Sequence, residues 1–386
     1  MHFTPQLRIP GPTPLPDSVV RAQSQPMIDH RGPQFAALLD EVSAGVKRVF
    51  GTANDLLVLT ASGTGGMESA VANLVSPGDV AVVATCGNFG ERWIGILKAY
   101  GAKVVILETE WGQAVEPGDL RDVLAAHPEA QLVFLTHNET STGVVNPLRE
   151  LAAVASQDGR VVVVDGVSSV SSMAIEVDAW GIDVAVSSSQ KGWMAPPGLA
   201  FVTVSSKAWQ RQEAARSPRF YFDWTQAREW AAKGMTPATP AVSVLFAVQE
   251  GLRLLESEGL ERVFARHRRV ADAAAAGLQA LGFTLFAAEG RRSPTVTAAL
   301  PPPGLEVAPL RQLLRTKFGV EIAGGQGKMT GKMVRIGHLG AVSEGDIVQV
   351  LWALEQALEQ LDVTPADGRA VAAATAALNL EAVPAG

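Results

Sequence analysis

The chain has 386 residues, of which 47% are hydrophobic and 18% charged, a length that predicts two domains or a large domain with a smaller one. A net charge of −7, from 32 basic and 39 acidic residues, argues against nucleic acid as a partner. The single cysteine excludes an internal disulfide framework, and no apolar run approaches the roughly 20 residues of a membrane helix. We therefore expect a soluble, cytoplasmic protein without a membrane partner.

Short apolar strands alternate with helical stretches in the first two thirds of the chain. The expected strands are residues 56–60, 80–85, 104–107, 131–136, 161–165, 184–187 and 199–204. The helices expected between them are residues 67–74, 90–100, 120–126 and 147–156. This order predicts an α/β fold with a mostly parallel, seven-stranded sheet covered by helices on both faces.

The pattern changes after about residue 240. Two long helices are expected at 243–256 and 261–281, followed by a strand at 295–300, a helix at 310–318, a strand at 333–336 and a helix at 344–361. We divide the chain into an N-terminal arm (1–20), a large domain (21–255), a small α+β domain (256–363) and an alanine-rich tail (364–386). The composition of the tail fits one helix or none.

Lys191 follows an apolar strand and lies among small hydroxyl residues, in the run Ser187-Ser188-Ser189-Gln190-Lys191. Burial favours the neutral amine, a nucleophile that condenses with aldehydes. Asp165 ends another apolar strand. An amine and an acid at neighbouring strand ends suggest a pyridoxal phosphate site, in which the amine bonds the aldehyde and the acid pairs with the pyridinium nitrogen. The alternative is an ordinary surface lysine after a strand.

The segment Ser62-Gly63-Thr64-Gly65-Gly66 follows a strand and opens a helix. Backbone N–H groups and the positive end of a helix point at an anion in such a segment, which makes it a candidate phosphate cradle. A dinucleotide fingerprint fails because Glu68 stands where the third glycine belongs, and a Walker loop fails because no Gly-Lys-Ser/Thr follows. The alternative is a simple tight turn.

Two further polar segments, residues 85–92 and 136–143, also end strands. Ligands of open α/β sheets bind at the carboxyl ends of the strands, so polar tips after residues 60, 85, 136 and 165 predict an active-site crevice. Phe89 either stacks on a heteroaromatic ring or packs in the core. Arg335, in a strand with apolar neighbours, is either solvated or a bidentate clamp for a carboxylate.

In their order and spacing, these segments resemble the class V aminotransferases of fold type I, and most of all the alanine–glyoxylate and serine–pyruvate aminotransferase group. The matching stretches are residues 10–14, 62–65, 88–92, 140–144, 164–169, 189–191, 196–198, 236–240, 293–297 and 334–337. The resemblance covers about residues 8 to 360 and leaves out the alanine-rich tail.

The resemblance implies pyridoxal phosphate as the cofactor and a role for each matching residue. Lys191 resembles the Schiff-base lysine, Asp165 the pyridinium partner, and Arg335 the residue that binds the substrate carboxylate. The other implied cofactor contacts are to the phosphate from Thr64, Gly65, Gly66 and Gln190, to the ring faces from Phe89 and Val167, and near the ring hydroxyl from Thr140. Phe89 departs from the tryptophan often found at this position, which changes the volume of the pocket.

The resemblance also implies a homodimer with shared active sites, in which Thr236 and Thr239 reach the phosphate of the neighbouring subunit. The implied activity moves an amino group between a small amino acid, alanine or serine, and a small 2-oxo acid, glyoxylate or pyruvate. No metal is expected.

Other functions on the same fold stay open. An aminophosphonate or phosphoserine transaminase would need further basic groups, for which Arg291 and Arg292 are candidates. A cysteine desulfurase would need a mobile nucleophilic cysteine, whereas Cys86 stands beside Gly87 in a position suited to packing. A silent binding subunit is the non-enzyme alternative, and the presence of Lys191 together with Asp165 argues against it.

Overall fold

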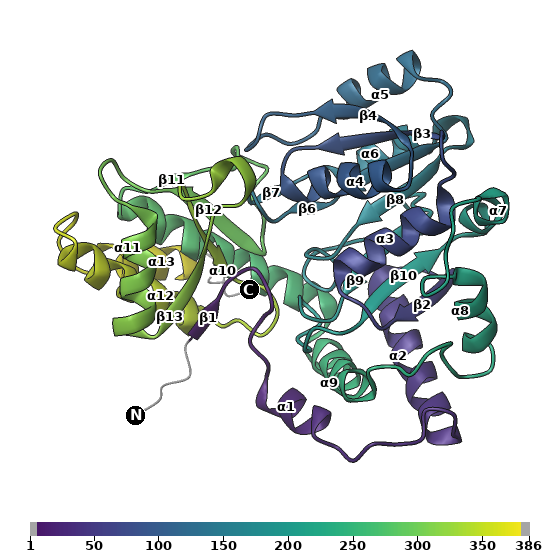
Figure 1. Ribbon diagram of the computed structural model, residues 1–386. Coiled ribbons are helices and arrows are strands. Elements are labelled where there is room, and N and C mark those ends of the chain that lie inside the picture. Colours follow the sequence, from purple (N-terminus) through teal and green to yellow (C-terminus); the bar gives the residue numbers. More distant parts are fainter. Residues whose placement is uncertain (1–5, 380–386) are drawn as a thin grey trace, which may run out of the picture.

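The computed structural model describes residues 6–379, which form a large sheet, a small sheet and one short hairpin, with helices around them (Figure 1). The large sheet has the strand order β2-β10-β9-β8-β5-β3-β4. Its strands are β2 (Asp55–Leu59), β3 (Val80–Thr85), β4 (Lys103–Glu108), β5 (Leu132–Thr136), β8 (Val161–Asp165), β9 (Val184–Ser188) and β10 (Ala200–Val204). Only β10 runs antiparallel to its neighbours, so the prediction of a mostly parallel seven-stranded sheet is confirmed.

Alternate side chains of the large sheet enter two separate cores, because successive residues of a strand point to opposite faces. In β8, Val162 and Val164 pack in the core formed with α2 (Pro33–Phe50), α5 (Pro117–Ala126), α6 (Leu148–Ala155) and α9 (Val242–Glu258). Val161 and Val163 pack in the core formed with α3 (Gly63–Leu74), α4 (Asn88–Ala99), α7 (Ser206–Ala214) and α8 (Trp224–Ala231). Helices therefore cover both faces, as the apolar strands predict.

A smaller sheet of order β1-β13-β14-β12-β11 lies beside the large one (Figure 1). Its strands are β1 (Gln6–Arg8), β11 (Thr284–Leu285), β12 (Val296–Leu300), β13 (Val320–Gly324) and β14 (Val334–Gly337). A third core joins it to α10 (Leu260–Ala280), α11 (Val307–Leu313), α12 (Glu344–Gln360) and α13 (Arg369–Asn379). The N-terminal arm thus contributes β1 to a sheet otherwise made from the C-terminal third of the chain.

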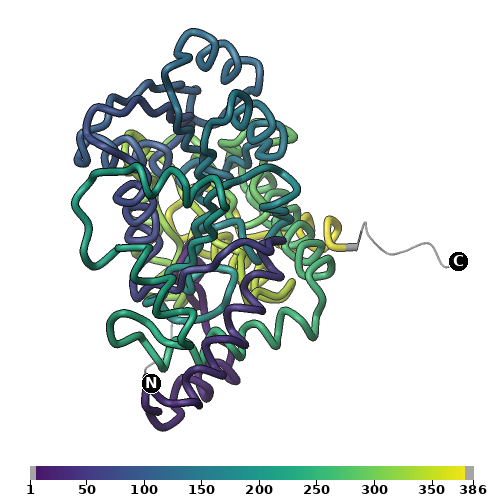
Figure 2. Tube along the Cα trace, turned by 90° about the vertical axis from the view of Figure 1, so that its right-hand side faces the viewer, coloured from purple at the N-terminus to yellow at the C-terminus, as the bar shows by residue number. Residues whose placement is uncertain are grey.

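The remaining elements are short or peripheral. They are α1 (Asp17–Gln23), the hairpin β6 (Asn138–Glu139) and β7 (Val144–Val145), two 3-10 turns (Gln157–Gly159 and Gly327–Met329) and a π turn (Leu314–Phe318). Helices α1 and α2 (purple) lie at the opposite end of the molecule from α5 (blue) in both views (Figure 2). No helix of the described residues is long and apolar enough to cross a membrane.

The sequence predicts each strand of the large sheet to within one residue at either end. Helix α3 begins at Gly63 and not near residue 67, because the glycine-rich segment forms its first turn. The elements not predicted from the sequence are α1, α2, α7, α8, β1, β6, β7, β11 and β13. In the tail, α13 forms one helix against α10 and α12, and residues 380–386 lie outside the described part. The domain division stays a prediction.

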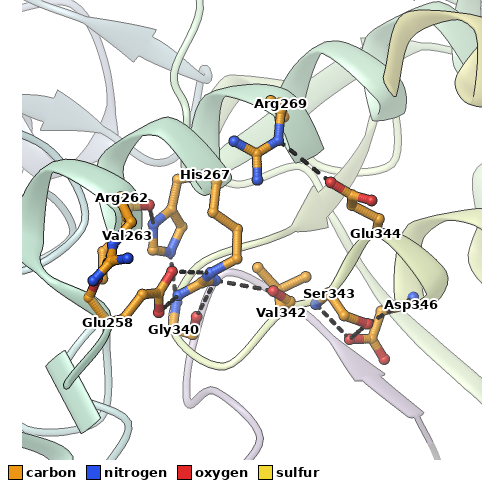
Figure 3. Close-up of polar contacts among 11 residues, drawn as sticks. Glu258, Arg262, Val263, His267, Arg269, Gly340, Val342, Ser343, Glu344 and Asp346 are labelled. Carbon is orange, nitrogen blue, oxygen red and sulfur yellow. Dashed lines mark hydrogen bonds and ion pairs between the residues drawn. The ribbon is translucent and has the colours of Figure 1, made fainter. Parts of the chain in front are cut away.

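Polar contacts of Arg266 and His267, here called the joint, connect the end of α9 and the start of α10 to the segment that follows β14 (Figure 3). Arg266 forms a bidentate pair with Glu258 at 2.7 and 2.9 Å, and its Nη1 donates to the carbonyls of Gly340 (3.0 Å) and Val342 (2.9 Å). Nε2 of the buried His267 accepts a hydrogen bond from Gly340 N at 3.0 Å. Burial, and then the charge of Arg266, lower the pKa of His267 to about 3, so the ring stays neutral and can accept.

We expect Arg266→Met to lower the free energy of unfolding by about 2 kcal/mol, because Glu258 and two carbonyls lose a charged donor. Arg253→Met is the matched control, since Arg253 pairs with Glu41 and Glu250 at the surface and should contribute less than about 1 kcal/mol. Denaturant midpoints at one protein concentration measure both. Equal decreases in the free energy of unfolding would mean that the contacts of Arg266 stabilise the fold no more than a surface ion pair does.

Candidate active site

The carboxyl ends of the parallel strands meet along one edge of the large sheet. Because β2, β3, β5, β8 and β9 all run in the same direction, the segments that follow them lie along the same edge. These segments contain the polar tips predicted from the sequence, and Lys191 follows β9. The topology therefore gathers the predicted crevice at one place.

The amine of Lys191 lies against the N-terminal arm. Its Nζ donates a hydrogen bond to the carbonyl of Pro10 at 2.6 Å. Gly11 adopts a φ of +136°, and a Cβ on it would lie 2.5 Å from Nζ, so only glycine fits here. Burial lowers the pKa of Lys191 to about 8; Asp165 opposes this shift, and Arg335 and Arg92 add to it. At neutral pH, about one amine in ten is then uncharged.

Asp165 is 5% exposed at the end of β8, and its Oδ1 accepts a hydrogen bond from Val167 N at 2.9 Å. Burial raises its pKa to about 6, opposed by the hydrogen bond and by the charges of Arg92 and Lys191. The carboxyl is thus mostly ionised at neutral pH. Because Asp165 and Lys191 each shift the pKa of the other, the two groups interact electrostatically, as their positions at neighbouring strand ends predict.

The segment after β2 forms the first turn of α3. The side chain of Ser62 caps the helix by accepting from Gly65 N at 3.4 Å. A Cβ on Gly63 would lie 2.8 Å from Val167 and 3.0 Å from Ser188, so glycine lets the helix start close to β8 and β9. The N–H groups of a first helical turn have no partner within the helix, which favours an anion at this end.

Phe89 lies half-buried in the first turn of α4, next to Arg92. The guanidinium carbon of Arg92 is 4.6 Å from the centroid of the Phe89 ring, and Nη1 donates to Thr64 Oγ1 at 3.0 Å. The sequence analysis gave Arg92 no role. Its position three residues after Phe89 is the signal that could have found it, because residues three apart share one face of a helix.

Glu139, also missed from the sequence, is a fully buried carboxyl between these elements. It accepts hydrogen bonds from Phe89 N (3.0 Å), Gly90 N (3.1 Å), Ser141 N (3.1 Å) and Ser141 Oγ (2.6 Å). Burial raises its pKa to about 7. A carboxylate that holds the first N–H groups of α4 fixes the start of the helix and thereby the backbone of Phe89.

Arg335 is 5% exposed, which excludes the solvated alternative. Its Nε donates to Gly324 O (2.8 Å), and its Nη1 donates to Thr140 O (3.0 Å) and Gln326 Oε1 (3.3 Å). Burial lowers its pKa to about 10, opposed by the charge of Glu139. Within residues 6–379, Nη2 makes no hydrogen bond or ion pair, so one edge of the guanidinium stays available to a carboxylate.

The other predicted cofactor residues divide into two groups. Thr140 Oγ1 donates to Ser168 Oγ at 2.7 Å, Val167 contacts Gly63, and the carbonyl of Gln190 accepts from Thr13 N at 3.1 Å, so all three belong to the strand-end crevice. Thr236 instead lines a cavity of about 600 Å³ with residues of α2 and β2, and Thr239 is exposed. Within residues 6–379, neither threonine forms a hydrogen bond with Lys191, Asp165 or the first turn of α3.

The residues proposed for alternative functions lie in other surroundings. Cys86 is buried against Asn146, and burial raises the pKa of its thiol to about 12, the opposite of what a sulfur-accepting nucleophile needs. Arg291 pairs with Glu116 at 3.4 Å, and with Arg292 it lines a cavity of about 410 Å³ beside α10 and β12.

The carboxyl edge of the large sheet offers the groups that pyridoxal phosphate requires. The amine of Lys191 has a lowered pKa, Asp165 is a buried carboxylate, Phe89 is a half-buried flat ring, and the first turn of α3 suits an anion. A Cβ on Gly63 would collide with Val167, and a Cβ on Gly11 would collide with Lys191, so both positions require glycine. This fold and donor set define a fold type I pyridoxal phosphate enzyme.

Sequence comparison identifies the family. Residues 10–344 match the family described as aminotransferase class V. The chain belongs to this family, and its cofactor is pyridoxal phosphate, in agreement with the resemblance found from the motifs.

Individual relatives carry different names. The chain is 42% identical to the soluble hydrogenase small subunit of Synechococcus sp., over 98% of this chain and 100% of the relative. It is 37% identical to the serine–glyoxylate aminotransferase of Hyphomicrobium methylovorum, over 93% of this chain and 91% of that one. The structure of the pyridoxamine–pyruvate aminotransferase of Mesorhizobium loti superposes with a TM-score of 0.93 and 30% identity, over 99% of both chains.

The pKa of Lys191 can be measured in the protein without cofactor by trace labelling with acetic anhydride. The label on the Lys191 peptide should rise with pH and reach half of its plateau near pH 8, because the neutral amine forms above its lowered pKa. The reference compound Nα-acetyl-lysine should reach its half-plateau near pH ~10.4. Coincident profiles for the two amines would show that the protein does not disfavour the ammonium.

Glu139→Gln should lower both the stability of the protein and its affinity for the cofactor. Either orientation of the amide turns an NH₂ group toward backbone N–H donors. We expect a loss of about 1–3 kcal/mol in unfolding free energy and weaker retention of pyridoxal phosphate in equilibrium dialysis at pH 8. Glu91→Gln, an exposed carboxylate in the same turn of α4, is the control and should change neither. If Glu139→Gln behaves like this control, Glu139 does not support cofactor binding.

Proposed function

We propose that this class V aminotransferase moves an amino group between alanine or serine and glyoxylate or pyruvate, with Lys191 and Asp165 as its catalytic residues. The observation that carries the proposal is the half-buried Lys191, whose amine donates to Pro10 O at the carboxyl edge of the large sheet and interacts electrostatically with Asp165. The named relatives support the substrates, because one acts on serine and glyoxylate and another on pyruvate.

Pyridoxal phosphate supplies an aldehyde for the amine and a ring that takes up electrons when a proton leaves the substrate. Lys191 would hold the cofactor through this aldehyde, and its amine would be free when an amino acid takes that position. Its free amine removes the proton from Cα of the substrate and later returns a proton, which a group with a pKa near 8 can do at neutral pH.

Arg335 binds the carboxylate of the substrate through the edge that the protein leaves open, and so fixes Cα relative to Lys191. Asp165, which is mostly ionised at neutral pH, would hold a proton on the ring nitrogen of the bound cofactor. We assign Thr64, Gly65, Gly66 and Gln190 to the phosphate, Phe89 and Val167 to the ring faces, and Thr140 to the ring hydroxyl.

The homodimer is part of the proposal. Thr236 and Thr239 resemble phosphate ligands of the family, yet within its own chain Thr236 lines the cavity beside α2 and β2, and Thr239 is exposed. A second copy that brings this segment to the crevice accounts for both observations. The exposed Phe220 (86%) and Tyr221 (55%), in the loop beside α3, are apolar surface that such a contact would cover.

The side chains of this protein do not fit the hydrogenase activity in the name of one relative. The sequence has one cysteine, which is buried, and within residues 6–379 no three His, Cys, Asp or Glu side chains are placed to hold a metal. The thiolate ligands that iron–sulfur clusters use are therefore lacking.

The amino donor is tested by single-turnover mixing. The protein loaded with pyridoxal phosphate is mixed with one amino acid and no acceptor, and the visible absorption of the bound aldehyde form is followed. Alanine and serine should bleach this absorption, and glyoxylate or pyruvate should restore it. If phosphoserine or an aminophosphonate bleaches it while alanine and serine do not, the substrate assignment is wrong.

Asp165→Asn should lower kcat by roughly 100-fold or more, because the isosteric amide cannot hold a proton on the ring nitrogen. The affinity for pyridoxal phosphate should fall by less than about tenfold, since the phosphate and ring contacts remain. Steady-state kinetics and equilibrium dialysis measure the two quantities. Parallel losses in both would argue against an electronic role for Asp165.

A further inference from the structure

The residues assigned to the cofactor's phosphate leave its charge unbalanced. A phosphate monoester carries about −1.5 to −2 charges at neutral pH. The groups assigned to it, Thr64, Gly65, Gly66 and Gln190, are all neutral, and so is the capping residue Ser62. The end of a helix supplies only about half a positive charge. A further cation near the first turn of α3 would offset the remaining negative charge.

Arg92 lies at this place. Its Nη1 donates to Oγ1 of Thr64 at 3.0 Å, and Thr64 is the second residue of α3. Its guanidinium is also 4.6 Å from the centre of the Phe89 ring, on which the cofactor is proposed to stack. The side chain therefore touches one residue assigned to the phosphate and one assigned to the ring.

The charge of Arg92 also reaches the catalytic pair. It lowers the pKa of Asp165 and of Lys191, in the direction expected for a nearby cation. Arg92 is half-buried, and no carboxylate within residues 6–379 forms an ion pair with it. A guanidinium that has only a hydroxyl and an aromatic ring as partners has several N–H donors left for an anion.

We propose that Arg92 is a ligand of the cofactor's phosphate and that it makes this site select pyridoxal phosphate over pyridoxal. The inference rests on the proposed function, and it adds a residue that neither the motifs nor the proposed contacts assign. Selection of the phosphate is a real distinction on this fold, since the Mesorhizobium loti enzyme is named for pyridoxamine, which has no phosphate.

Two other roles for Arg92 predict different behaviour. As a tie between α3 and α4, it would support the site without contacting the cofactor, and its loss would weaken both aldehydes alike. If Arg92 instead covers Phe89 until the cofactor displaces it, its loss would raise the affinity for both aldehydes equally. Loss of a phosphate ligand lowers the affinity for pyridoxal phosphate, leaves that for pyridoxal unchanged, and leaves the unfolding midpoint of the cofactor-free protein unchanged.

The test compares pyridoxal phosphate with pyridoxal, which carry the same aldehyde and ring and differ in the phosphate. Each is titrated into cofactor-free dimer at pH 8, and binding is followed by absorbance and by quenching of tryptophan fluorescence. The proteins are wild type, Arg92→Gln, Arg92→Lys and Lys98→Ala, an exposed lysine later in α4 that serves as the control.

For Arg92→Gln we expect the Kd of pyridoxal phosphate to rise roughly 10- to 100-fold, the usual range for a hydrogen bond to a charged group. The Kd of pyridoxal should stay within about twofold of the wild-type value. Arg92→Lys keeps the charge and should recover part of the loss, and Lys98→Ala should match wild type.

Equal weakening or equal strengthening of both aldehydes in Arg92→Gln would overturn the inference. Failure of the proposed function has a different outcome: the wild-type protein would not bind pyridoxal phosphate at all. Thermal unfolding of each cofactor-free variant distinguishes the roles further, because a phosphate ligand should leave the midpoint close to that of Lys98→Ala.

Discussion

The burial of one amine is the constraint on which the rest of the site depends. The amine of Lys191 is taken out of water, where an ammonium is unfavourable, and its remaining hydrogen bond goes to a backbone carbonyl of the N-terminal arm. The arm can approach so closely because Gly11 has no side chain. Asp165 and the two arginines then set the balance between charged and neutral amine, since the carboxylate favours the ammonium and the arginines oppose it.

Segments far apart in the sequence have to be held together for this balance to exist. Gly337 passes the backbone of Ile9 and Pro10 so closely that any side chain would collide with it. Gly340, three residues beyond β14, lies next to Thr13 and the carbonyl of Lys191, and the joint of Arg266 and His267 holds it to α10. The strand that carries Arg335 and the segment that carries Lys191 are thus fixed relative to each other by backbone contacts.

Much of this arrangement could be predicted from local signals. The apolar strands and their polar tips show which segments meet, because parallel strands place their carboxyl ends on one edge. Lys191, Asp165 and Arg335 are recognisable as charged residues next to apolar runs. Helices α2, α7 and α8 were missed, and β13 was missed because its run Val-Glu-Ile-Ala-Gly is short and mixed.

The residues that were not predicted act through distant partners. Glu139 accepts the N–H groups of Phe89 and Gly90 only because α4 starts next to it, and no local pattern predicts this contact. The spacing of Arg92 from Phe89 is a local signal, but its hydrogen bond to Thr64 depends on α3 lying beside α4. The proposed role of Thr236 and Thr239 depends on a second chain, which no single-chain pattern describes. Long-range contacts of this kind come from the packing of complete elements and not from the sequence near each residue.

The most direct test of the account is to find which amine holds the cofactor. Protein loaded with pyridoxal phosphate is reduced with borohydride, digested, and mapped by mass spectrometry. The account predicts one modified residue, Lys191, at a stoichiometry near one per chain. A modification spread over surface lysines, or one that leaves the Lys191 peptide unchanged, would contradict it.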